Sequence, residues 1–446
     1  MEPAQDQVHT STDAGAPGSS IAPENDTGLD SRPALPGFDP LSPEQVRDPH
    51  PVLERARRER PVFFSAQQGV WCVTRFEDVK RIYGDPIAFS NSKTHGSRVT
   101  IPEAIQVELG SDVEEYEFAI AKGALNDTDP PVHTRVRKVL QPHFTASRVK
   151  GYEPMIQLYA DELVDCLVDG GECDMLQEFS APLAARVIAT LLGVSRTDAA
   201  QFKAWADARF HLMGGSDALD HEETLAAWRG AIEFDRYVEK LVADRRRTPH
   251  DDLTSNIVHA EGADGRPALS DDEAYANVSG MVSAGSDTTA GLITHAVYLL
   301  LIDPPRWEAI KRDPSGIPRA VEETMRMMGP VRGVFRRTTK AVELGGVTIP
   351  EGEEIYIHLA SAGRDDQVFR CPHVFDAARA NASDHLGFGI WTHFCVGAVL
   401  ARAEARIALE TFVRRLPDLR LLSTPEELEF TPSQLVCSLK GLRVAW

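Results

Sequence analysis

The sequence lacks the features of a secreted, membrane-spanning or nucleic-acid-binding protein. Its first ten residues, MEPAQDQVHT, have neither the basic start nor the apolar stretch of a signal peptide. No uninterrupted apolar run reaches the ~20 residues that a membrane span needs. Positive charge is scarce, since 47 lysines and arginines stand against 67 acidic residues and leave a net charge of −20. This balance repels nucleic acid and anionic lipid, so we expect a cytoplasmic protein that binds neither.

Cysteine is also scarce, with six in 446 residues, and no two of them form a CxxC pair. The sequence has no zinc-like cluster of cysteine and histidine. Scattered cysteines suit a reducing compartment better than a disulfide scaffold.

The chain divides into two parts by composition. Residues 1–36 are rich in small and polar residues without an apolar period, which predicts a disordered tail. Residues 37–446 contain no second low-complexity linker and no evident internal repeat, so we expect one large domain there.

Helical periodicity dominates the middle of the chain, and short β-prone runs lie on either side of it. The longest predicted helix runs from about Asp271 to Ile302 and is apolar on nearly all sides, which indicates that it crosses the interior. We expect a mainly α fold with a minor β region. The predicted strands are Val62–Phe64, Val70–Thr74, Val342–Leu344 and Glu354–Ile357, and the other predicted helices are Phe76–Tyr83, 151–169, 180–193, 197–213, 222–247 and 396–414.

A glycine-bearing loop delivers Cys395 to the start of the last helix, in the segment GFGIWTHFCVGAVLAR (residues 387–402). The N–H groups and the dipole at a helix start stabilise a thiolate, and Gly397 lets the backbone approach a flat partner closely. Taken alone, this cysteine is better explained as a buried structural residue at a helix start.

The surrounding residues resemble the haem-binding signature of the cytochrome P450 family, Phe-Gly-x-Gly-x-His/Arg-x-Cys-x-Gly. Phe388, Gly389, His393, Cys395 and Gly397 match this pattern. The resemblance covers about residues 40–446. It implies the cytochrome P450 fold, with haem b (iron protoporphyrin IX) buried between the long central helix and the cysteine-loop helix and with Cys395 as the axial ligand.

Trp391 departs from the signature, because it stands where the second glycine is usual. We expect the indole to re-angle the turn at a cost of ~1 kcal/mol. The resemblance places this loop on the face where an electron donor docks, so we hypothesise that Trp391 alters partner choice or affinity. The alternative is a tolerated variant.

Within the central helix, Asp287 and Thr288 follow Gly285 in an otherwise apolar stretch. The Thr288 hydroxyl can bond a helix carbonyl and open the hydrogen-bond ladder. The resemblance identifies the two as an acid–alcohol pair, in which Asp287 relays protons and Thr288 stabilises the oxygen intermediate. A kinked helix with a capped threonine is the structural alternative.

Glu323 and Arg326 are three residues apart on one predicted helix face and can pair. Surface pairs of this spacing contribute little to stability. The resemblance instead implies a buried Glu-x-x-Arg motif that locks the core beside the haem.

Four cations match positions that hold the two haem carboxylates in the family. His133 and Arg137 lie four residues apart on one helix face, while Arg336 precedes a predicted strand and His393 precedes the cysteine by two. Each alone is equally explained as a solvated surface cation.

The resemblance implies a monooxygenase that inserts one oxygen atom from O₂ into a small or medium hydrophobic substrate. Hydroxylation, O-dealkylation and epoxidation all fit this class. Electrons are expected from an iron–sulfur ferredoxin or a flavodoxin with its reductase, docking on a basic patch that includes Arg135, Lys138 and Arg402.

Two alternatives remain open. One is an enzyme of the same fold that couples, desaturates or rearranges its substrate without retaining oxygen. The other is a non-catalytic haem-based binder or sensor, which would have no need for Asp287 and Thr288.

Family geometry also implies a substrate pocket of mostly small or apolar residues. Its two charged members, Lys93 and Arg98, could anchor a substrate carboxylate, although charged loop residues are usually solvated. The pocket residues implied are Lys93, Arg98, Val282, Val331, Val334 and Val436.

Overall fold

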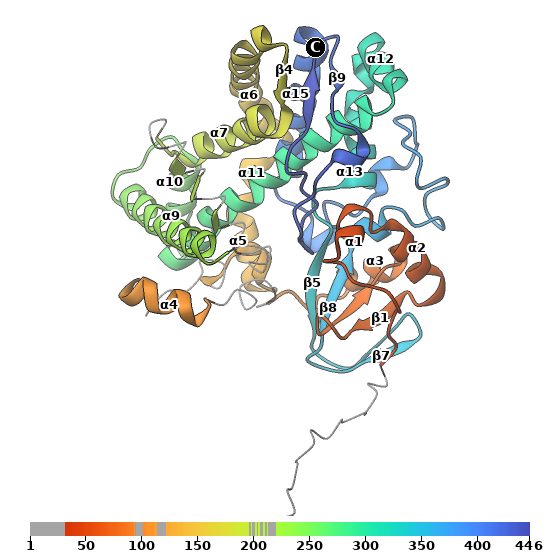
Figure 1. Ribbon diagram of the computed structural model, residues 1–446. Helices are drawn as coiled ribbons and strands as arrows, with labels where there is room; N and C mark the ends of the chain where they lie inside the picture. Colours follow the sequence, from red (N-terminus) through yellow and green to blue (C-terminus); the bar gives the residue numbers. More distant parts are fainter. Residues whose placement is uncertain are drawn as a thin grey trace, which may run out of the picture. The chain divides into compact units, whose positions relative to one another are not determined.

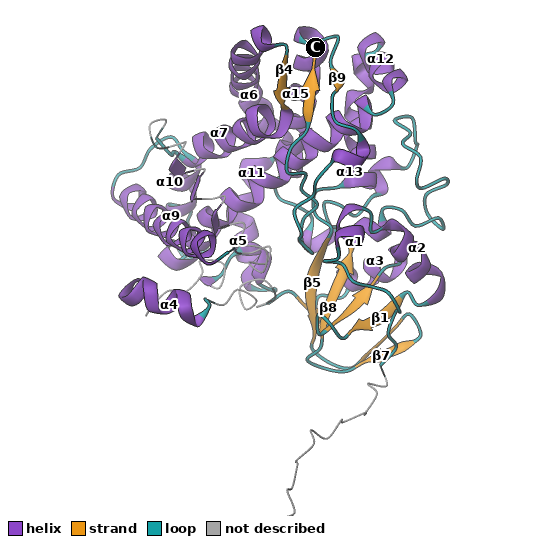
Figure 2. Ribbon diagram, viewed as in Figure 1, coloured by secondary structure: helices purple, strands orange, loops and turns teal. Residues whose placement is uncertain are grey.

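Helices account for most of the computed structural model, as the periodicity predicts (Figures 1 and 2). The structure describes residues 32–92, 94, 101–113, 122–195, 198, 201–202, 204–205, 208–209, 212 and 220–446. One compact unit spans Pro33–Trp446. It begins four residues before the predicted start of the domain at residue 37, and Leu35 is already buried in its core.

The α-helices among the described residues follow the sequence in order. They are α1 (Pro43–Arg47), α2 (His50–Glu59), α3 (Phe76–Gly84), α4 (Glu103–Leu109), α5 (Val132–Leu140), α6 (Ala146–Leu167), α7 (Ala181–Leu192), α9 (His221–Arg247), α10 (Leu253–Val258), α11 (Asp271–Leu301), α12 (Pro304–Arg312), α13 (Ile317–Met328), α14 (Leu359–Ala362) and α15 (Ala398–Arg415). The predicted helix over 197–213 falls largely outside the described residues.

The strands among the described residues form three small sheets. They are β1 (Val62–Ser65), β2 (Val70–Val73), β3 (Phe89–Ser90), β4 (Glu172–Asp174), β5 (Gly333–Thr338), β6 (Val342–Leu344), β7 (Val347–Ile349), β8 (Glu354–His358), β9 (Arg420–Leu421) and β10 (Arg443–Ala445). The largest sheet has the order β1-β2-β8-β5-β3, the second β4-β10-β9, and β6 pairs with β7 alone.

The five-stranded sheet confirms the predicted hairpin, since β1 and β2 pair antiparallel with Phe63 opposite Cys72. Within this sheet only the β2–β8 pair is parallel, and it joins residues 71–73 to 355–357. Strand β5, which lies between β8 and β3, was not predicted from the sequence. Its two adjacent arginines, Arg336 and Arg337, interrupt the apolar alternation that marks a strand.

The central helix α11 confirms the prediction of an interior crossing (Figure 1). It begins with a capping box, in which Ser270 accepts from the Glu273 backbone N–H and the Glu273 side chain accepts from the Ser270 backbone N–H. It packs against α7, α9, α13 and α15. Among the described residues, no helix is long and apolar enough to cross a membrane.

Candidate active site

The cysteine loop is fixed by backbone contacts at both ends. The Cys395 N–H donates to the Phe388 carbonyl at 2.7 Å. Gly389 has a φ of 65°, and a Cβ there would lie 2.8 Å from the His393 carbonyl oxygen. Any other residue at 389 would therefore strain the backbone and meet the returning loop. The loop sets the Cys395 thiol three residues before Ala398, the first residue of α15.

The surroundings of Cys395 have two opposing effects on the pKa of its thiol. Removal of water by the surrounding protein raises the pKa of the thiol, although the residue keeps solvent contact. The backbone N–H groups of Gly397 and Ala398 and the charges of Arg137 and Arg402 lower it. A Cβ on Gly397 would lie 4.0 Å from the sulfur, so the bare glycine leaves open the space beside it. Burial has the larger effect, so the pKa of the thiol stays above its ordinary value, and these donors and charges offset part of the rise.

Trp391 corrects one prediction. Its φ of 52° lies in the left-handed region that favours glycine, so the loop keeps a glycine-like turn and the expectation of a re-angled turn is wrong. The indole is 56% exposed and lies against Gly84 at the end of α3, where a Cβ would be 3.0 Å from the ring. The missing side chain of Gly84 therefore makes room for the indole.

Three of the four predicted carboxylate-binding cations meet at the cysteine loop. His133 is buried on α5, with its ring centroid 4.4 Å from that of His393. One turn further along α5, the Arg137 guanidinium donates to the carbonyls of Thr392 at 3.1 Å and Phe394 at 2.8 Å. The predicted i, i+4 face of α5 therefore points at this loop.

Arg336, the fourth cation, is buried on β5 close to the others. Its guanidinium donates to the Asn91 side chain at 2.6 Å and lies over the Tyr83 ring. Burial, followed by the charges of Arg137 and Arg336, lowers the pKa of His133 to about 4, against an opposing effect of Asp129. The structure therefore gathers all four predicted cations into one region.

One observation in particular indicates that these four residues could hold a haem. Both ring nitrogens of His133 are buried, and within the described part of the chain neither has a hydrogen-bond partner. A buried polar group without a partner costs roughly 1–3 kcal/mol, so an acidic group of a bound cofactor would stabilise this histidine. The acidic groups of haem are its two carboxylates, and the guanidinium groups of Arg137 and Arg336 suit the same ligand.

The predicted acid–alcohol pair lies within α11, which is continuous from Asp271 to Leu301. The Thr288 hydroxyl donates to the Ala284 carbonyl at 2.5 Å, which is the i−4 contact that the sequence predicts. Asp287 is partly buried beside it. Gly285 faces Ile188 of α7, where an added Cβ would lie 3.4 Å from that side chain, so it allows the two helices to approach closely.

Sequence reasoning missed a buried ionic cluster one turn before Asp287. Arg209 is 1% exposed, and its Nε lies 3.6 Å from the carboxylate of Asp235 on α9. The same guanidinium donates to the Ser283 hydroxyl of α11 at 3.2 Å. The cluster ties α9 to the turn of α11 that precedes the acid–alcohol pair. Ser279 and Ser283, spaced four apart on an apolar helix, were the available sequence signal.

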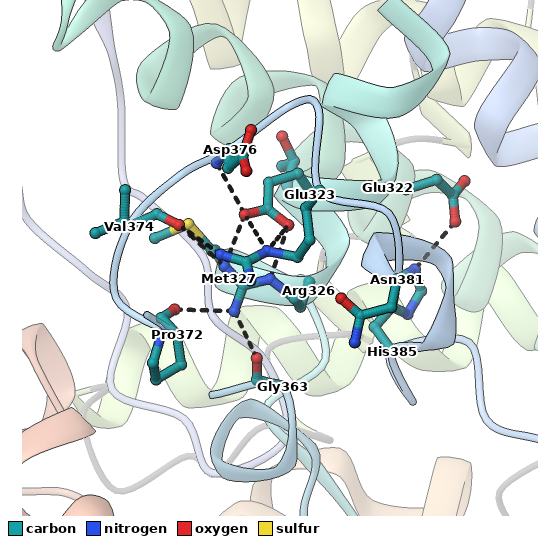
Figure 3. Close-up of polar contacts among 12 residues, drawn as sticks. Glu322, Glu323, Arg326, Met327, Gly363, Pro372, Val374, Asp376, Asn381 and His385 are labelled. Carbon is teal, nitrogen blue, oxygen red and sulfur yellow. Dashed lines mark hydrogen bonds and ion pairs between the residues drawn. The ribbon is translucent and has the colours of Figure 1, made fainter. Parts of the chain in front are cut away.

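Glu323 and Arg326 form a fully buried ion pair with two contacts, at 2.7 and 2.8 Å (Figure 3). Arg326 also donates to the carbonyls of Gly363 and Pro372 at 2.8 and 2.9 Å. A second guanidinium, that of Arg379, approaches Glu323 at 3.1 Å and was not predicted. The pair therefore anchors the loop around residues 363–379 to α13.

The neighbouring Glu322 joins α13 to α15 and to His385, which lies 3.3 Å away (Figure 3). Arg402 donates two hydrogen bonds to it, at 2.6 and 2.9 Å, and lies over the Phe388 ring. Burial alone would raise the pKa of Glu322, but the hydrogen bonds from His385 and Arg402 hold it at about 2.

The predicted basic docking patch is less charged than its sequence suggests. Arg402 is neutralised by Glu322, and Arg135 forms an ion pair of 2.5 Å with Glu273. Lys138 is exposed on α5.

The predicted substrate-pocket residues are partly brought together. Val331 and Val436 face each other in an antiparallel bridge. One turn past Thr288, a Cβ on Gly291 would lie 3.1 Å from the Pro330 side chain, so α11 contacts this wall directly. Val334 follows on β5, Val282 is buried on α11, and Lys93 and Arg98 lie outside the described residues.

Comparison with known proteins identifies the family. The family model described as Cytochrome P450 matches residues 111–313 and 317–438. Cytochrome P450 107B1 of Saccharopolyspora erythraea is 36% identical over 404 residues, which cover 90% of this chain and 95% of that relative. The 6-deoxyerythronolide B hydroxylase of the same organism is 33% identical over 385 residues, covering 86% and 92%.

A solved structure agrees with the sequence relatives. The P450 haem domain of Tepidiphilus thermophilus superimposes with a TM-score of 0.84 at 29% identity, covering 92% of this chain and 97% of that one. The fold is thus that of a known enzyme family. The chain belongs to the cytochrome P450 family and is a bacterial-type P450 monooxygenase with haem b as its cofactor.

Proposed function

We propose that this enzyme inserts one oxygen atom from O₂ into a small or medium hydrophobic substrate, with electrons from a ferredoxin-type donor. The observation that carries the proposal is the setting of Cys395 at the start of α15, with two backbone N–H groups and two guanidinium groups favouring the thiolate. Such a setting suits a ligand of the haem iron, and it lies beside the cluster of His133, Arg137, Arg336 and His393, which fits the haem carboxylates.

Each group of site residues has a separate part in this proposal. Cys395 would ligate the haem iron, and His133, Arg137, Arg336 and His393 would hold the haem carboxylates. Phe388, Gly389 and Gly397 shape the loop around the sulfur, while Gly285, Glu323 and Arg326 keep the surrounding scaffold in place. Haem with a thiolate ligand supplies the chemistry of O–O cleavage, and the protein supplies position and protons.

Asp287 is the proposed proton relay, and the Thr288 hydroxyl is proposed to stabilise the reacting oxygen. The Thr288 hydroxyl sits on the Ala284 carbonyl, which fixes the direction of its oxygen within α11. Asp287 is partly buried at the adjacent position and can pass protons inward from solvent. The ionic cluster of Arg209, Asp235 and Ser283 holds the preceding turn of the helix, so it supports the position of the pair.

The substrate class is proposed from the apolar residues of the wall that α11 contacts near Pro330. Val331 and Val436 bridge at this wall, and Val282 and Val334 extend the apolar lining along α11 and β5. Apolar side chains favour a hydrophobic substrate body. One relative is named 6-deoxyerythronolide B hydroxylase, and this similarity supports hydroxylation as the reaction.

Trp391 is the proposed specificity element for the electron donor. Its exposed indole lies four residues before Cys395 on the same loop, and Lys138 offers an exposed charge on α5. Reduction rates of Trp391→Gly with several ferredoxins test this. We expect the order of preference among the donors to change, and unchanged rates with every donor would rule the idea out.

Product analysis with isotopically labelled O₂ tests the reaction itself. We expect one labelled oxygen atom in the product, formed with consumption of reducing equivalents from the donor system. A product formed by coupling, desaturation or rearrangement with no label would contradict oxygen insertion. The Thr288→Ser variant serves as the control that keeps a hydroxyl at this position. Thr288→Ala is expected to form product roughly 10- to 100-fold more slowly, because the positioned hydroxyl is lost.

A further inference from the structure

A cavity of about 430 Å³, separate from the cysteine loop, lies between the N-terminal helices, the ends of α11 and α13, and the C-terminal segment. Its rim includes the exposed residues Arg47 and Glu426, and the Arg47 guanidinium donates to the Glu426 carbonyl at 3.1 Å. The walls further in include the buried apolar residues Met327 and Leu428. The size is within the range of small-molecule sites.

The cavity has an excess of positive charge. The guanidinium groups of Arg47, Arg332 and Arg364 face two carboxylates, those of Asp48 and Glu426, which leaves one net positive charge. Burial, then the charge of the nearby Arg326, lowers the pKa of Arg364 only to about 10, so its group stays cationic at neutral pH. Such a lining attracts one negative charge.

Two polar atoms at this cavity need a partner. Arg332 is 7% exposed, and its side chain donates to the Val46 carbonyl and to the Cys437 sulfur at 3.8 Å. Within the described part of the chain, neither the Nε of Arg332 nor the Nδ1 of His50 has a hydrogen-bond partner, and both are buried. Burial and nearby cations lower the pKa of His50 well below its usual range, so the ring is neutral.

We propose that this cavity binds a small organic monoanion, a carboxylate whose head is held by Arg332 and Arg364 and whose hydrocarbon body lies on Met327 and Leu428. A carboxylate oxygen can accept from the guanidinium groups that line the cavity, and a charge-assisted hydrogen bond of this kind contributes about 1.5–3 kcal/mol. One carboxylate also balances the single excess charge of the lining. This site is separate from the cysteine loop and does not depend on the proposed substrate.

The site shares a wall with the proposed substrate pocket, so a test must keep the ligand away from the haem. Arg332 and Cys437 directly follow the bridged pair Val331 and Val436, and the Cys437 N–H donates to the Pro330 carbonyl at 2.7 Å. Titrating octanoate into the holoenzyme with its haem iron saturated by imidazole isolates this cavity. Binding is measured by calorimetry, and the haem spectrum must stay unchanged.

We expect saturable octanoate binding with a Kd below about 1 mM. The neutral analogue 1-octanol should bind at least tenfold more weakly, and Arg332→Gln should weaken octanoate binding by roughly 10-fold or more. Arg58→Gln changes an exposed arginine of α2 outside the cavity and should leave the affinity unchanged. If Arg332→Gln fails to fold, the octanoate affinities of Arg47→Gln and His50→Leu are compared with that of Arg58→Gln instead. No saturable binding, equal affinity for the alcohol, or unchanged affinity in folded cavity variants would overturn the proposal.

Discussion

Trp391 and Gly84 form a complementary pair at the surface of the cysteine loop. A tryptophan in the left-handed region stores backbone strain of about 1–3 kcal/mol, which the surrounding structure must offset. Part of the offset comes from the contact of the indole with the bare backbone of Gly84. The two positions should therefore be coupled in their effect on stability.

A double-mutant cycle measures this coupling. Gly84→Ala alone should lower the free energy of unfolding by about 1 kcal/mol, because the new Cβ meets the indole at 3.0 Å. In the Trp391→Gly background the same change should stabilise the protein by roughly 0.4–1 kcal/mol, since alanine restricts the unfolded chain. Gly151→Ala in α6 is the matched control, because a Cβ there meets nothing within 4 Å. Equal effects of Gly84→Ala in both backgrounds would contradict the pairing.

Glu323 pairs with two buried guanidinium groups, those of Arg326 and Arg379. Among the described residues it is the only carboxylate paired with either group. Glu323→Gln should lower the free energy of unfolding by about 3–5 kcal/mol, because it leaves uncompensated buried charge. Haem content should fall with it. Arg379→Gln is the comparison and should cost less, since Arg326 still neutralises Glu323. Denaturant unfolding decides the matter, and an equal cost for the two variants would sink the assignment.

At the scale of elements, α13 and α15 are joined by Glu322 and Arg402, while the adjacent Glu323 and Arg326 tie α13 to the loop at 363–379. One short helix thus holds both the cysteine-loop helix and the segment that leads to the loop. This arrangement explains why two acidic residues stand side by side in the motif: their side chains face different partners.

The link between α13 and α15 should depend on pH in a defined direction. The folded-state pKa of Glu322 is about 2, below its ordinary value of 4.5, so its contribution to stability is complete above about pH 5 and is lost as the pH falls toward 2. Glu322→Gln should remove this part of the acid sensitivity, and Arg402→Gln should reduce it. Unfolding free energies measured between pH 6 and 3 provide the check. Parallel curves for the parent protein and Glu322→Gln would show that the carboxylate is not stabilised by these partners.

On the scale of the whole molecule, local patterns predicted the elements that carry their own periodicity. The hairpin of β1 and β2, the interior helix α11 and the final helix α15 all follow from apolar spacing and turn residues. By contrast, β5 became a central strand only because β8 and β3 pair with it, and its arginines hide that role in the sequence. Pairing between distant segments has no local signature.

The site shows the same division. The cysteine loop, the acid–alcohol pair and the ion pair at Glu323 have fixed spacings in the sequence, so they could be located before the fold was known. Arg209 and Arg379 could not, because each meets its carboxylate across a long sequence separation. The left-handed backbone at Trp391 was likewise hidden, since the residue type disfavours the conformation that the loop imposes.

The thiolate ligation of haem by Cys395 is the central claim, and one spectrum tests it most directly. The reduced holoenzyme should show, on binding carbon monoxide, a Soret band at the position characteristic of thiolate ligation, and Cys395→Ser should lose that band. Cys166→Ser, which changes an exposed cysteine of α6, should keep it. A thiolate-type band that persists in Cys395→Ser, or its absence from the parent enzyme, would contradict the account.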